Sequence, residues 1–197
     1  MAIGFTYIQL MLVITIIWVI VRVVAGLVKK KVDWKYELKL LTVYLSIALV
    51  TRLVYFPEVI TPMDDKVYFY TGKYVVNRLN LRPFIYLKHR YQGWFINMYG
   101  NIIMFIPVGM VWPYCFKKLN NVFKVVLAGF GYSLSIELSQ LFVFARGTDI
   151  DDLILNTFGT LIGALLYFYL TPLLRKIVKK CLKVEDEKTD EKLEEKE

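Results

Sequence analysis

Residues 3–28 read IGFTYIQLMLVITIIWVIVRVVAGLV, and Arg22 is the only charged side chain among them. About 20 consecutive, mostly apolar residues are enough for a helix to cross the hydrocarbon core of a bilayer. No basic segment precedes this run, and no small-residue cleavage site follows it before Lys29, so it lacks the pattern of a secretory signal peptide. The run is predicted to be a transmembrane helix.

Four further apolar runs of similar length follow. They cover residues 38–56, 94–116, 122–144 and 153–174. The chain is 57% hydrophobic with a mean hydropathy of +0.47, whereas soluble domains are about 45–50% apolar. The runs are continuous rather than alternating, which argues against a transmembrane β-barrel. We therefore predict an all-α, polytopic helical membrane protein with about five transmembrane helices.

The distribution of charge predicts how these helices are oriented. Thirteen Lys and Arg residues lie in the connections after the first, third and fifth runs, and seven lie in the other two connections. Cytoplasmic loops carry the excess of positive charge, so the N-terminus is predicted outside and the C-terminus in the cytoplasm. Residues 1–184 form a single predicted membrane domain. Residues 185–197 are rich in Glu and Lys and are predicted to be a charged cytoplasmic tail.

The long connection between the second and third runs, residues 57–92, is rich in aromatic and basic side chains. The segment holds six Lys and Arg residues, and five of them lie among the aromatic residues from Tyr68 to Tyr91. Such a mixture is typical of a segment at the membrane interface, with its rings at headgroup depth and its charges toward water or phosphate. The segment is predicted to be interfacial, either as an anchoring aromatic belt or as a lid or ligand-binding loop.

The net charge of +8 could indicate binding to nucleic acid or to anionic lipids. Because the basic residues flank apolar runs, where they set topology and meet anionic headgroups, we predict membrane lipids and no nucleic acid. His89 is the one histidine, which excludes a His-rich metal site, and two cysteines cannot support a disulfide framework. We predict no cofactor and no metal. The sequence leaves the oligomeric state open.

Polar side chains inside the apolar runs are the candidate functional residues, because they are costly in a membrane and face a bundle interior or a water-filled cavity. With the predicted orientation, all of them lie toward the outer leaflet. The third run supplies Asn101, the fourth supplies Glu137 and Gln140, and the fifth supplies Asn156. The turn before the fifth run adds Arg146, Asp149 and Asp152. We predict that these residues form one polar pocket.

Several kinds of chemistry fit such a pocket. Glu137 or Asp152 is a candidate general base, and Glu137 with Asp149 and Asp152 has the oxygen ligands that divalent cations prefer. Arg146 could pair with a phosphate or carboxylate of a ligand. The same groups could instead form a purely structural network.

The polar positions also form motifs. The segments are Asn80-Leu-Arg-Pro-Phe84, Asn101-Ile-Ile-Met-Phe-Ile-Pro-Val-Gly109, Glu137-Leu-Ser-Gln140 and Arg146-Gly-Thr-Asp-Ile-Asp-Asp-Leu-Ile-Leu-Asn-Thr-Phe-Gly159, followed by Gly163. Together they resemble the VanZ-like membrane protein family over residues 76–170, although Arg82 places a charge inside the first motif. The resemblance adds Asn80 and Arg82 to the candidate ligand-binding residues.

The family is named for a protein that confers resistance to teicoplanin, a lipoglycopeptide antibiotic that acts on cell-wall precursors. The resemblance implies a bacterial plasma-membrane protein that lowers susceptibility to such drugs. The ligand of its outer-leaflet pocket would be the drug, a lipid-linked peptidoglycan precursor or a lipid headgroup. The alternative function is an intramembrane enzyme that modifies a lipid-linked envelope substrate with Glu137, Asp152 and Arg146. The third hypothesis is a transporter or channel, which five spans without an evident inverted repeat disfavour.

Overall fold

The computed structural model describes residues 2–30, 32–56, 66–70, 79–84, 94–143, 147–174 and 176–177. In this part of the chain, five helices are long and apolar enough to cross a membrane. They are α1 (Tyr7–Lys29), α2 (Trp34–Tyr55), α4 (Trp94–Cys115), α5 (Val122–Gln140) and α6 (Ile150–Leu165), which continues through the π-helix η2 (Leu166–Leu170). The prediction of a polytopic helical membrane protein is confirmed.

The helix boundaries correct four of the predicted runs. The second helix begins at Trp34 instead of residue 38. The first helix begins at Tyr7 rather than at residue 3, because Thr6 forms a capping box with Gln9 and residues before it form a strand. This strand, β1 (Ala2–Thr6), pairs antiparallel with β2 (Lys66–Tyr70). The fourth helix ends at Gln140 instead of residue 144, and the fifth begins at Ile150 instead of residue 153.

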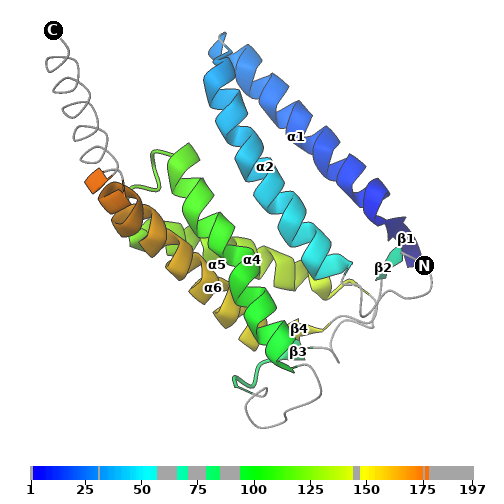
Figure 1. The fold of residues 1–197 in the computed structure, drawn as a ribbon. Coiled ribbons are helices and arrows are strands. Elements are labelled where there is room, and N and C mark those ends of the chain that lie inside the picture. Colours follow the sequence, from blue (N-terminus) through cyan, green and yellow to red (C-terminus); the bar gives the residue numbers. More distant parts are fainter. Residues whose placement is uncertain are drawn as a thin grey trace, which may run out of the picture.

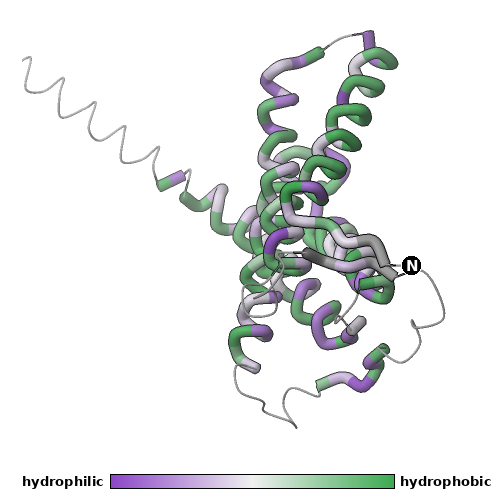
Figure 2. The backbone as a smooth tube through the Cα atoms, turned by 90° about the vertical axis from the view of Figure 1, so that its right-hand side faces the viewer, coloured by the Kyte–Doolittle hydropathy of each residue, from purple (hydrophilic) through white to green (hydrophobic). Residues whose placement is uncertain are grey.

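The two ends of the bundle differ in what they carry (Figure 1). One end holds the α1–α2 turn, the α4–α5 turn and the end of α6. The other end holds the N-terminus, β1 and β2, and a second strand pair formed by β3 (Leu79–Asn80) and β4 (Thr148–Asp149). This arrangement is the one expected for five successive spans. Figure 2 shows that the long helices are mostly hydrophobic along their length.

The backbones of helices α4 and α6 lie in direct contact, because glycine residues at the contact leave out the side chains that would keep them apart. A Cβ atom placed on Gly159 would collide with the carbonyl oxygen of Ile102, and one placed on Gly163 would collide with the carbonyl oxygen of Ile106. Gly109 on α4 lies against Gly163 in the same contact. Small residues allow such an approach in membranes, where van der Waals packing drives helix association. The contact holds the second half of α6 against α4.

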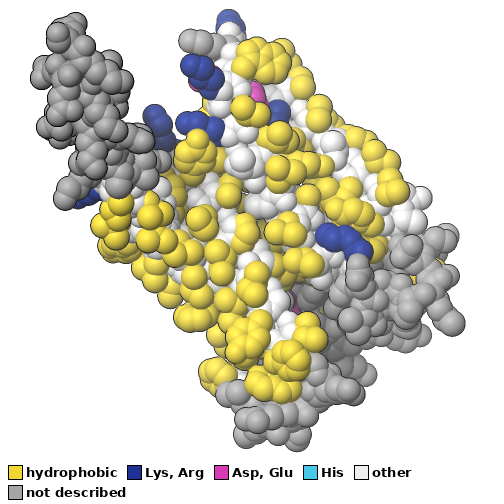
Figure 3. Space-filling model, viewed as in Figure 1, with side chains coloured by type: hydrophobic (Ala, Val, Ile, Leu, Met, Phe, Trp, Pro, Cys, Tyr) yellow, Lys and Arg dark blue, Asp and Glu magenta, His cyan; other side chains and the backbone are white. Residues whose placement is uncertain are grey.

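The side chains buried among the helices are few, and the outer surface is apolar. A cluster of buried residues joins α2, α4 and α5; it consists of Val50, Val54, Met104, Phe105, Val108 and Ile136. Helix α1 has no buried residue. Exposed apolar side chains cover the face seen in Figure 3, as expected for helices that contact acyl chains. Most of the Lys and Arg side chains on that face lie toward the end with the α1–α2 turn.

Candidate functional site

The site is built around the short parallel pairing of β3 with β4, which joins two distant parts of the chain. Asn80 lies opposite Asp149 in this pair. The side-chain amide of Asn80 donates to Asp149 Oδ1 at 3.1 Å, and its oxygen accepts from the backbone N–H of Arg82 at 3.1 Å. The motif that precedes α4 is thereby held against the start of α6.

Asp149 also caps α6. Its Oδ1 accepts from the backbone N–H of Asp151 at 2.9 Å, which satisfies one of the free donors at the helix start. Asp151 is only 4% exposed, and its Oδ1 accepts from the backbone N–H of Phe84 at 2.6 Å. Phe84 has a φ of 65°, a left-handed conformation that is uncommon for an aromatic residue. The carboxylate of Asp151 therefore holds a strained turn in place.

Glu137 reaches the same place from the last turn of α5. Its side chain is 2% exposed, and Oε2 accepts from the backbone N–H of Asp149 at 3.0 Å. Its backbone carbonyl accepts from the hydroxyl of Thr148 at 2.6 Å. A buried carboxyl group in a membrane protein needs such donors, because water is not there to solvate it. The bonds tie α5 to β4.

Two amide side chains connect the remaining helices. Asn101 on α4 donates to Asp152 Oδ1 on α6 at 2.6 Å. Asn156 on α6, which is 1% exposed, donates to Ser133 Oγ on α5 at 2.9 Å. Ser133, Glu137 and Gln140 are all buried, as expected for side chains on one stripe of α5.

We refer to Asn80, Asn101, Glu137, Asp149, Asp151 and Asp152 as the acid–amide cluster. Sequence reasoning predicted all of these except Asp151, and the signal it passed over was an acidic residue in the first turn of a helix. It also passed over Thr148. Gln140 and Asn156 are buried as well, and the side-chain amide oxygen of each has no hydrogen-bond partner in the described part of the chain.

Of the two arginines that were predicted to bind a ligand, only Arg82 is among the described residues. Arg146 lies outside the described residues. The Arg82 residue is exposed. Its backbone N–H donates a hydrogen bond to the side chain of Asn80, and this bond joins it to the cluster. The described residues also contain no group of three or more His, Cys, Asp or Glu side chains placed to hold a metal ion. Only Lys66–Tyr70 and residues 79–84 of the predicted interfacial segment 57–92 are described, and the predicted tail 185–197 lies outside them.

The capping role of Asp149 gives a stability prediction. Asp149→Ala should lower the free energy of unfolding by about 1 kcal/mol or more, because the helix cap and the bond from Asn80 are both lost. Asp149→Asn retains a good capping side chain and should unfold near the wild-type temperature. Thermal unfolding of the purified protein in detergent measures both. Equal losses in the two variants would contradict the capping role.

Comparison with known proteins assigns the chain to a family. The model of the VanZ/LLP1 family matches residues 8–174. The chain belongs to the VanZ/LLP1 family. The match runs from α1 to the end of the fifth span, so it includes the two helices outside the motif region 76–170.

Alignment with one curated relative gives the sequence identity and the part of each chain that it covers. The chain is 41% identical over 92 residues to Protein VanZ of Enterococcus faecium, an alignment that covers 45% of this chain and 52% of the relative. The chain thus spans about half the length of the curated VanZ relative that it matches. No solved structure matches the chain.

Proposed function

We propose that this chain is a multi-pass protein of the bacterial plasma membrane that lowers susceptibility to lipoglycopeptide antibiotics such as teicoplanin. It would do so by binding a ligand at the acid–amide cluster. The observation that carries the proposal is the convergence of α4, α5, α6, β3 and β4 on one group of carboxylates and amides at one end of the bundle. Membership of the VanZ/LLP1 family supports the link to resistance.

The proposal includes an orientation, with the N-terminus outside and the C-terminus in the cytoplasm. The α1–α2 turn and the α4–α5 turn lie at the end opposite to the cluster, and these connections are rich in lysine. By the positive-inside rule, this arrangement supports an orientation with the cluster at the outer face. This is where a drug outside the cell and a lipid-linked cell-wall precursor meet.

The chemistry of the cluster limits the ligand groups that it would hold. Carboxylates and amide oxygens accept hydrogen bonds, so they favour hydroxyl, amide or ammonium groups. Arg82 and Arg146 would add charge for a phosphate or carboxylate. Both a lipoglycopeptide and a lipid-linked peptidoglycan precursor carry groups of these kinds, and so does a lipid headgroup.

The proposal is tested by susceptibility measurements in a teicoplanin-susceptible Gram-positive host. The wild-type chain should raise the minimal inhibitory concentration of teicoplanin several-fold over the empty vector. Asp152→Ala should remove most of this rise, because it breaks the link between α4 and α6 at the cluster. Lys124→Ala, at the opposite end of α5, should keep it. No rise with the wild-type chain, at normal protein level in the membrane, would contradict the proposal.

A second candidate is an intramembrane enzyme acting on a lipid-linked envelope substrate. The near-complete burial of Glu137 beside Asp149 favours it, because buried carboxyl groups are common as general bases. Asp152 is the other candidate base, and Arg146 would hold a phosphate. Incubation of the purified protein with labelled envelope lipids distinguishes the two functions, since only the enzyme would release a product that Glu137→Gln fails to make.

A further inference from the structure

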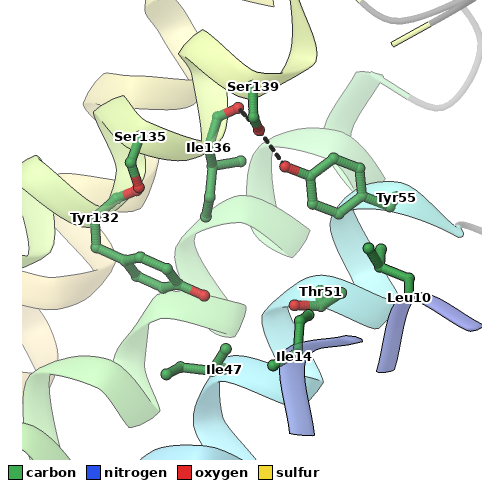
Figure 4. Close-up of a pocket in the computed structure, with 9 residues that line it drawn as sticks. All are labelled: Leu10, Ile14, Ile47, Thr51, Tyr55, Tyr132, Ser135, Ile136 and Ser139. Carbon is green, nitrogen blue, oxygen red and sulfur yellow. Dashed lines mark hydrogen bonds between the residues drawn. The ribbon is translucent and has the colours of Figure 1, made fainter. Parts of the chain in front are cut away.

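A second site lies on a different face of α5 from Glu137. It is a pocket of about 290 Å³ between α1, α2 and α5 (Figure 4). Leu10 and Ile14 of α1 form one wall, and Ile47 lies on α2. The hydroxyl-bearing side chains are Thr51 and Tyr55 of α2 and Tyr132, Ser135 and Ser139 of α5. The acid–amide cluster contributes no side chain to this pocket.

The pocket runs along the helices over a length close to the thickness of one leaflet. Ile47, Thr51 and Tyr55 are four residues apart, so they line one face of α2 over about 12 Å at 1.5 Å per residue. The whole hydrocarbon core is about 30 Å thick, so this length covers most of one leaflet. The hydroxyl groups of Tyr55 and Ser139 bond to each other at the ends of their helices and form its rim (Figure 4).

Two hydroxyl groups in the pocket have no hydrogen-bond partner within the described part of the chain. They belong to Tyr132 on α5 and to Thr51 on α2, and Figure 4 shows both directed into the space between these helices. The Tyr132 ring is fixed by Trp112 and Phe105, with ring centroids at 5.3 and 5.6 Å. Thr51 is 6% exposed. A polar group at this depth needs a partner, because hydrocarbon supplies none.

We propose that this pocket binds one acyl chain of a membrane phospholipid, with its ester carbonyl accepting hydrogen bonds from Tyr132 and Thr51. The apolar walls suit an acyl chain, and the two hydroxyl groups are donors of the kind that an ester carbonyl oxygen accepts from. Thr51 lies one turn before the end of α2, so it is nearer to the end of this span than to its middle. Helix α1, which has no buried residue, forms a loosely packed side for lipid entry. The inference goes beyond the proposed function and does not depend on it.

Photolabelling of the purified full chain tests the site without any antibiotic. The protein is placed in phosphatidylglycerol vesicles that contain a phospholipid with a photoreactive diazirine in its acyl chain, and labelled residues are located by mass spectrometry. Labelling at Ile14 and Ile47 should exceed labelling at Ile16 and Leu45 several-fold, although Ile16 and Leu45 are 56% and 57% exposed on the same helices. A bound chain stays beside the pocket residues, whereas bulk lipid exchanges.

Variants test whether the pocket causes the excess labelling of Ile14 and Ile47. Ser135→Trp places a large ring on the pocket wall and should abolish the excess labelling. Leu134→Trp, at the neighbouring position outside the pocket lining, should leave it unchanged. The conservative pair Tyr132→Phe and Thr51→Val removes the donors and should reduce it several-fold. This pair keeps the test decisive where the tryptophan variant fails to fold.

Three results would overturn the inference. The first is equal labelling of pocket and outward-facing residues. The second is an excess that persists after Tyr132→Phe and Thr51→Val. The third is reaction of an Ile47→Cys variant with a water-soluble thiol reagent, which would show that the pocket holds water instead of an acyl chain.

Discussion

Replacing Glu137 by alanine is expected to return teicoplanin susceptibility to the level of the empty vector. The substitution removes the carboxylate that accepts from the backbone N–H of Asp149, and that N–H is left without this acceptor in a partly buried position. Losing such a bond costs about 1–3 kcal/mol, so the unfolding temperature should also fall. The minimal inhibitory concentration and the amount of protein in the membrane are measured together.

Glu137→Gln separates the charge of this residue from its structural bond. Glutamine has nearly the same size and keeps an oxygen that accepts from Asp149, so the variant should fold like the wild type. If the ligand needs the carboxylate, resistance should still be lost. Resistance retained by Glu137→Gln but lost by Glu137→Ala would show that Glu137 only supports the fold, and resistance retained by both would exclude it from the site.

The second large effect is expected at the contact between α4 and α6. Gly159→Ala should lower the free energy of unfolding by about 1–3 kcal/mol or more, because the new methyl group would overlap with the backbone carbonyl of Ile102 and force the two helices apart. The displacement would also separate Asn101 from Asp152, so resistance should fall with stability. Thermal unfolding in detergent measures the loss.

Two other glycines provide matched controls on neighbouring helices. A Cβ atom on Gly100 of α4 or on Gly131 of α5 would meet nothing within 4 Å. Alanine at these positions should leave stability unchanged or raise it by about 0.5–1 kcal/mol, since glycine lowers helix stability. If Gly159→Ala were as stable as Gly131→Ala, the close backbone contact would not be a source of stability.

Sequence reasoning found most of the cluster because membranes restrict where polar side chains lie. An amide or acid in an apolar run must face the bundle, so Asn101, Glu137 and Asn156 could be assigned to the interior one at a time. Asp151 could not be assigned in this way. Its carboxylate accepts a hydrogen bond from the backbone N–H of Phe84, and nothing in the local sequence shows that contact.

The boundaries of the helices likewise depend partly on local sequence and partly on tertiary contacts. The capping box of Thr6 and Gln9 is a local signal that was present in the sequence. The strand before it was not predictable, because Ala2–Thr6 is mostly apolar and runs directly into the apolar helix, and its partner β2 lies far along the chain. Tertiary pairing overrode the local pattern there.

The amino-acid sequence by itself determined the membrane class, the number of spans and the approximate place of each polar group, because these depend on the length of an apolar run relative to the thickness of a bilayer. The pairing of Asn80 with Asp149, the choice of hydrogen-bond partner for each carboxylate and the hydroxyl pocket beside α5 came only from the folded chain. Each of these joins segments that are far apart in sequence, so it depends on how closely the helices approach, and glycine contacts across α4 and α6 set that distance.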